Sequence, residues 1–104
     1  MDMEQRKAEY EQKVGEIYAQ RARILKKAKD RKIAQDYLAM AEEIVALEYD
    51  ADRAEHQLRF CDTDTQRGRD QLTEYTRMME HGRARVKELT PKCQHLWEQL
   101  GISG

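Results

Sequence analysis

The stretch CDTDTQRGRD, residues 61–70, decides how this chain folds. Before it, over residues 33–61, apolar and small residues recur at alternating steps of four and three, and the same pattern resumes over 72–100. This heptad spacing is typical of helices that pack along their length. The question is whether one helix continues through the interruption or the chain turns there.

The residue types of this stretch favour a turn. Aspartate and threonine stabilise turns and helix caps, and Gly68 weakens a helix by about 1 kcal/mol. Thr63 followed by Gln66 fits a capping box, in which the two residues satisfy each other's backbone N–H groups. We therefore expect a turn over residues 62–68.

Two structures are compatible with the heptad pattern, an uninterrupted helix in a parallel dimer and an antiparallel hairpin. With the turn centred near residue 65, small residues face large ones in the hairpin: Leu47 faces Gly82, and Ala51 faces Met79. In the parallel dimer each residue faces its own copy, so alanines and glycines would leave voids. Because protein interiors are densely packed and voids destabilise them, the pattern favours the hairpin.

Charge favours the same choice. Residues 36–64 carry nine acidic and two basic side chains, whereas residues 65–104 carry seven basic and five acidic ones. An antiparallel return brings opposite charges together, although exposed pairs contribute only about 0.2–1 kcal/mol each. The predicted fold is all-α: a long helix over 3–61, a turn, and a returning helix over 69–100 with a possible break at Pro91.

The returning helix is too short to cover the whole first helix. In the predicted hairpin, residues of about 30–60 lie against 66–100, so residues 3–29 project beyond it. The projection has its own apolar stripe, formed by Tyr10, Val14, Ile17 and Ile24. A lone helix of this length is marginal in water, so we expect a second copy, further chain or another helical protein to cover the stripe.

The segment RARILKKAKDRK, residues 21–32, is strongly basic in a chain with 19 basic and 20 acidic residues overall. It predicts either a solubilising helix surface or a contact with a polyanion, since acidic surfaces are steered toward dense positive charge. The candidate site residues are Arg21, Arg23, Lys26, Lys27, Lys29, Arg31 and Lys32.

The possible polyanions can be ranked. Nucleic-acid binders usually have a basic domain with stacking aromatic residues, whereas this chain is nearly neutral and its tyrosines lie mostly on or near the heptad positions. A membrane-surface helix needs bulky apolar residues opposite the basic ones, and here only Ile24 and Leu25 are available. An acidic protein polymer fits best, and a microtubule is the leading candidate.

The segment HLWEQLGIS, residues 95–103, resembles the Leu-Trp-x-x-Leu-Gly-Ile segment of the antiparallel microtubule bundlers of the spindle midzone. Those proteins are helical, dimeric and microtubule-associated. The resemblance covers nine residues and implies a cytoskeletal or kinetochore coiled coil. The family's basic microtubule-binding helices have no counterpart here, and its segment lies nearer the start of the rod. The expected location is cytoplasmic or nuclear.

Other classes of function find little support. The three histidines lack partners at i, i+4, and Cys61 and Cys93 would lie more than about 30 Å apart along a helix, too far for a disulfide. A narrow helical pair has no pocket for catalysis, so we expect no enzyme, no metal and no cofactor. No apolar run reaches membrane-spanning length. The abrupt ends of the sequence suggest a fragment of a larger protein.

Overall fold

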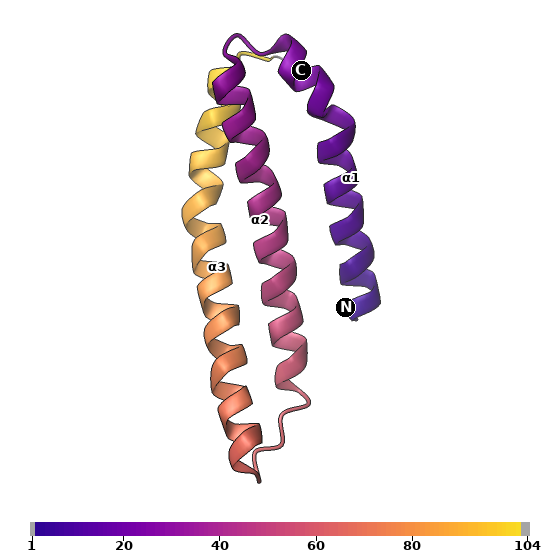
Figure 1. The fold of residues 1–104 in the computed structure, drawn as a ribbon, viewed down its shortest axis with the longest axis vertical. Helices are drawn as coiled ribbons and strands as arrows, with labels where there is room; N and C mark the ends of the chain where they lie inside the picture. The colour runs from indigo at the N-terminus through magenta and orange to yellow at the C-terminus, as the bar shows by residue number, and fades with distance from the viewer. Residues whose placement is uncertain (1, 103–104) are drawn as a thin grey trace.

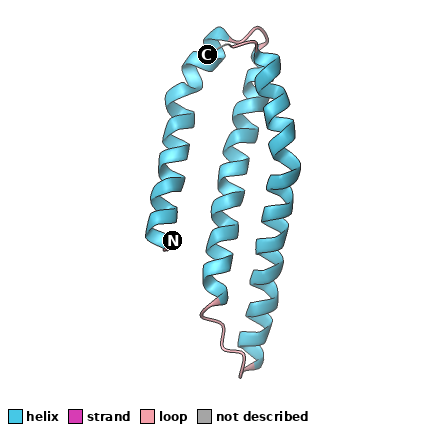
Figure 2. Ribbon diagram, turned by 180° about the vertical axis from the view of Figure 1, so that it is seen from behind, coloured by secondary structure: helices cyan, strands magenta, loops and turns pink. Residues whose placement is uncertain are grey.

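The structure, a computed structural model, describes residues 2–102 and consists there of three α-helices (Figure 1). They are α1 (Met3–Lys27), α2 (Arg31–Leu58) and α3 (Gln66–Leu100). Helix α2 lies between the other two and runs antiparallel to both, as Figures 1 and 2 show from opposite sides. The predicted all-helical class is confirmed, and no strand occurs in the described part of the chain.

The number of helices differs from the prediction. The long helix expected over 3–61 is two helices, and residues 3–29 do not project: α1 folds back along α2. Asp30 is the reason, because its carboxylate accepts hydrogen bonds from the N–H groups of Lys32 and Ile33 and so caps a new helix. The apolar stripe of residues 3–29 and the heptad pattern that starts at Ile33 are out of register with each other, and the turn lies between them. The predicted two-helix hairpin is thus wrong in its number of helices and in its overhang.

The main hydrophobic cluster lies at the end of the molecule where α1 turns into α2. One buried side chain of α1, two of α2 and one of α3 form it: Ile24, Ala34, Leu38 and Leu100. Around them pack half-buried residues such as Tyr37 and Trp97, whose rings are 5.3 Å apart. All three helices are therefore joined at this end.

Farther along the molecule, α2 and α3 approach closely because small residues separate them. Ala51 and Ala54 are almost fully buried on α2, and Gly82 is buried on α3. A Cβ atom added to Gly82 would lie 3.3 Å both from the Cβ of Ala51 and from the carbonyl oxygen of Leu47. Gly82 therefore lies against Leu47, the neighbour that the heptad pattern predicts.

The second turn and α3 also differ in detail from the prediction. Helix α3 begins at Gln66 instead of residue 69, and its N-cap is Thr65 instead of Thr63: the Thr65 hydroxyl accepts a hydrogen bond from the Gly68 N–H, 2.9 Å away. Gly68 is required here because a Cβ atom would collide with the Asp62 backbone.

The last turns of α3 contain one proline and end at a glycine. Pro91 lies inside the helix and does not break it. Gly101 ends it with a left-handed φ of 67°, a conformation that glycine adopts without steric cost. Ile102 then packs, like Trp97, against the hydrophobic cluster.

Candidate interaction site: the basic turn

The seven predicted basic residues surround the connection between α1 and α2. Four belong to the last two turns of α1, Lys29 to the connection and two to the start of α2: Arg21, Arg23, Lys26, Lys27, Lys29, Arg31 and Lys32. All seven are exposed. We call this set the basic turn. It lies at an end of the molecule instead of in the middle of a straight helix.

Some charges of the basic turn are balanced within the chain. The Arg21 guanidinium is 3.8 Å from a carboxylate oxygen of Glu42 on α2, and the Lys32 ammonium is 2.9 Å from the Asp36 carboxylate. Among residues 2–102, Lys26, Lys27, Lys29 and Arg31 form no ion pair. Four uncompensated positive charges are therefore concentrated within six residues of sequence.

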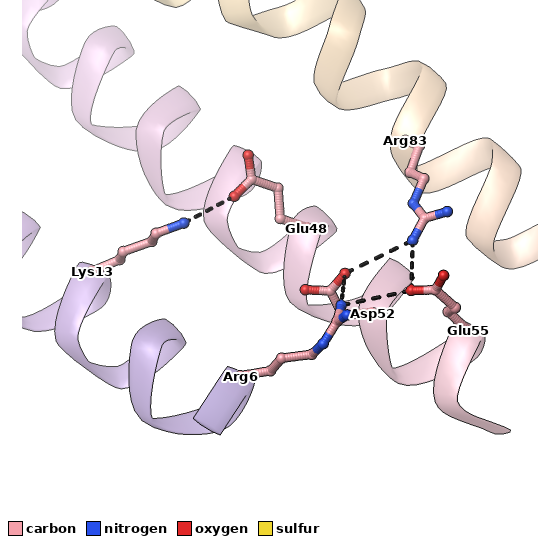
Figure 3. Close-up of polar contacts among 6 residues, drawn as sticks. All are labelled: Arg6, Lys13, Glu48, Asp52, Glu55 and Arg83. Carbon is pink, nitrogen blue, oxygen red and sulfur yellow. Dashed lines mark hydrogen bonds and ion pairs between the residues drawn. The ribbon is translucent and has the colours of Figure 1, made fainter. Parts of the chain in front are cut away.

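The acidic side chains of α2 are in a different situation. Carboxylates on its second half bind basic side chains of both neighbouring helices (Figure 3). Asp52 contacts Arg6 of α1 at 2.6 Å and Arg83 of α3 at 4.0 Å, and Glu55 contacts the same two arginines. The Lys13 ammonium lies 3.4 Å from Glu48. The acidic segment is thus largely neutralised inside the molecule, while the basic turn keeps its excess charge.

Two helix C-termini meet near the basic turn, and each attracts positive charge. Lys26 and Lys27 occupy the last turn of α1. The Lys29 side chain passes close to the end of α3, since a Cβ atom on Gly101 would lie 3.4 Å from its Nζ atom. A cation at such a terminus stabilises the helix by about 0.3–1 kcal/mol. This structural role accounts for part of the basic cluster and leaves the ammonium groups exposed.

The four residues of the predicted partner stripe lie on the side of α1 that faces α2. Ile24 is buried and Ile17 packs against the same cluster. The Tyr10 ring stacks on Tyr49 of α2 at 4.5 Å, and Val14 is half-buried. Helix α2 of the same chain covers this stripe. No other molecule is therefore needed to shield it from water.

An open hollow separates α1 from α2 beside the hydrophobic cluster. Its lining includes Ile17, Gln20, Tyr37 and Val45. Burial raises the pKa of the Tyr37 phenol, and the negative charge that Cys93 carries when it is ionised raises it further. Burial also raises the pKa of the Cys93 thiol. Both groups are therefore held in their neutral forms. Lys13 and Glu16 also line the hollow, whereas none of the seven residues of the basic turn does.

Within residues 2–102, no group of three or more His, Cys, Asp or Glu side chains is placed to hold a metal ion. Nor does any helix in that range combine the length and apolar character needed to span a membrane. Comparison of the chain with family models, curated proteins and solved structures finds no match. The basic turn is therefore assigned from its own geometry and charge.

Sequence patterns located the basic residues but missed their surroundings. Two signals were available: Asp30 is a strong helix-capping residue, and Gly101 ends α3. Together they bring the end of α3 beside Lys29, a contact that depends on the packing of α1 and α3 on opposite sides of α2.

Proposed function

We propose that this chain is a non-catalytic helical interaction module whose basic turn binds an acidic polymer, with the microtubule as the leading candidate. The observation that carries the proposal is the uneven compensation of charge. Carboxylates of α2 are paired by α1 and α3, whereas Lys26, Lys27, Lys29 and Arg31 are exposed without an ion pair among the described residues.

A polymer is favoured over a small ligand by the shape of the basic turn. Its exposed side chains spread around the end of the molecule where α1 turns into α2, which suits contact with a broad acidic surface. Flexible acidic segments such as tubulin tails would adapt to separate ammonium groups. Such contacts between exposed charges are screened by salt, with a Debye length of about 8 Å at physiological ionic strength. Binding should therefore be fast and sensitive to salt, and each charge contact should contribute little free energy.

Co-sedimentation with microtubules at two salt concentrations tests the proposal. The triple variant Lys27→Gln, Lys29→Gln, Arg31→Gln removes three charges from the basic turn. We expect its affinity at low salt to fall roughly tenfold, equivalent to about 1.4 kcal/mol. The matched control, Arg67→Gln, Arg77→Gln, Lys87→Gln, removes three exposed charges from α3 and should bind nearly as well as the wild type.

Two further results bear on the identity of the polymer. Removal of the acidic tubulin tails by proteolysis should weaken binding by a similar factor, and poly-glutamate should compete. Equal binding of the two triple variants would show that the basic turn is not the site. Preferential binding to RNA would still identify the basic turn as the site, but it would show that the polymer is a nucleic acid and not a microtubule.

A structural scaffold or dimerisation role remains a second candidate. The observation that favours it is the outward side of α1, where Tyr18 is 61% exposed.

A further inference from the structure

The outward side of α1 carries a second heptad stripe, distinct from the one that faces α2. Its members follow at alternating steps of three and four and share one side of the helix: Ala8, Glu11, Gly15, Tyr18, Ala22 and Leu25. The first five are exposed, whereas Leu25 is half-buried because it also packs against the hydrophobic cluster of the same chain. We call this set the outer stripe. A regular heptad pattern on a solvent-facing side indicates packing against another helix.

Gly15 and Tyr18 are the least expected residues at these positions in an isolated molecule. A Cβ atom on Gly15 would meet nothing within 4 Å, so the fold itself imposes no need for glycine. Glycine is less stable than alanine inside a helix because it loses more backbone freedom. Beside it, Tyr18 exposes 61% of its surface. An exposed ring beside a glycine allows two helices to interlock, because the ring of one helix fits into the space beside the glycine of the other.

We propose that the outer stripe binds the outer stripe of a second copy of this chain, with the two α1 helices antiparallel. In one register every layer then pairs a small residue with a larger one. Gly15 faces Tyr18 of the second copy, Ala8 faces Leu25, and Ala22 faces Glu11. The symmetry of a two-fold dimer repeats each pairing on the other side of the axis, which passes between residues 16 and 17.

The acidic residues of the outer stripe favour the antiparallel orientation, although Lys7 beside its start lies level with Lys26 of the second copy and reduces this preference. Glu4 and Glu11 lie toward the start of α1 and Lys26 toward its end, and none of the three has an ion pair among residues 2–102. In the proposed register Glu11 lies about one helical turn from Lys26 of the second copy. A parallel pair would instead place like charges opposite each other, which is destabilising.

The surface area of the chain leaves room for such a contact. It exposes 7421 Å², whereas a compact monomer of 12.3 kDa exposes about 6,100 Å². The difference exceeds the roughly 800 Å² per partner that a standard interface buries. A second copy is the favoured occupant because the outer stripe complements itself in both size and charge.

The antiparallel dimer also determines where the two basic turns lie. Their role in binding rests on the proposed function, whereas the dimer itself does not. Antiparallel α1 helices place the two basic turns at opposite ends of the pair, separated by roughly 35 Å of helix. One dimer would then present a polyanion-binding end in each of two opposite directions.

Sedimentation equilibrium of the full chain over a range of concentrations tests the pairing. We expect a monomer–dimer equilibrium in the wild type. Gly15→Leu should stabilise the isolated α1 yet fill the space for Tyr18 of the second copy, raising the dimer dissociation constant at least roughly tenfold. Ala84→Leu is the matched control, because it adds the same side chain to an exposed position of α3, and it should leave the constant unchanged.

Cysteine cross-linking tests the register. In a background with Cys61→Ser and Cys93→Ala, we expect a disulfide when Glu11→Cys chains are mixed with Ala22→Cys chains, and none when either variant is oxidised alone. Cross-linking of each variant with itself would indicate a parallel pair and overturn the proposed orientation. A wild-type monomer at all concentrations would overturn the dimer and leave the outer stripe to a different helical protein. Neither result depends on binding to microtubules.

Discussion

The Arg6 guanidinium, near the start of α1, lies 2.6 Å from the Asp52 carboxylate near the end of α2. These residues are far apart in sequence, and they meet because the chain reverses at residues 28–30. Arg83 of α3 approaches the same carboxylate from the other side at 4.0 Å (Figure 3). Asp52 therefore links the two helices that flank α2, between which no pair of Cα atoms comes within 8 Å.

A double-mutant cycle on Arg6 and Asp52 should detect the fold-back of α1. Arg6→Ala, Asp52→Ala and the double variant should give a coupling free energy of about 0.2–1 kcal/mol in urea unfolding, because both side chains are partly exposed. The coupling should decrease at 1 M salt. The pair Lys32 and Asp36, which lies within one helix, is the control that does not require the fold-back. Zero coupling for Arg6 and Asp52 at low salt would contradict the packing of α1.

The close approach of α2 and α3 makes Gly82 sensitive to substitution. Gly82→Leu should lower the free energy of unfolding by about 1–3 kcal/mol, because the new side chain must displace the Leu47 and Ala51 backbone region. Ala84→Leu places the same side chain two residues away on an exposed surface and should change the stability by less than about 0.5 kcal/mol. Thermal and urea unfolding measure both. Equal effects of the two variants would indicate that α3 does not pack on α2 through Gly82.

The cap at Asp30 should control the docking of α1. Asp30→Ala removes both hydrogen bonds to the first turn of α2 and should cost about 0.5–2 kcal/mol. Because the cap holds the turn between the two helices, amide hydrogen exchange should accelerate in α1 more than in α3. Asp36→Ala, which loses only an exposed ion pair, is the control. Uniform exchange in all three helices would show that the turn does not depend on this cap.

Alkaline pH should destabilise the fold through Cys93. Burial raises the pKa of its thiol above the ordinary value of 9.0, so the unfolded chain loses this proton at a lower pH than the folded chain does. The contribution is complete below pH 9 and disappears as pH rises through the folded pKa. Tyr37, whose pKa is also raised, acts in the same direction.

Urea unfolding between pH 7 and pH 11 measures this effect. Cys93→Ala should make the stability less dependent on pH above 9, and the pH profile is compared after each variant is normalised to its own stability at pH 7. Tyr37→Phe should further reduce the dependence. An identical pH profile for the wild type and both variants would show that neither group is buried enough to matter.

Much of the fold was predictable from local residue chemistry. The heptad pattern identified helical packing over 33–61 and 72–100, and the small residues at 51 and 82 indicated where α2 and α3 approach closely. Gly101, a residue type that commonly ends helices, is the C-cap of α3. The error at residues 28–30 arose because a register change between two apolar stripes has two explanations, an overhanging helix and a turn. Only Asp30 distinguished them locally, and a single capping residue contributes about 1 kcal/mol.

The candidate site shows the same division. The sequence by itself determined that the chain forms helices, that small residues permit close packing and that seven basic side chains cluster near residue 27, because these properties depend on composition and local spacing. Only the tertiary structure decided that α1 doubles back, that its inner stripe is covered by α2, and that the basic cluster becomes an end of the molecule beside the C-terminus of α3. Those relationships depend on contacts between residues far apart in the chain, whose free energies no local pattern contains.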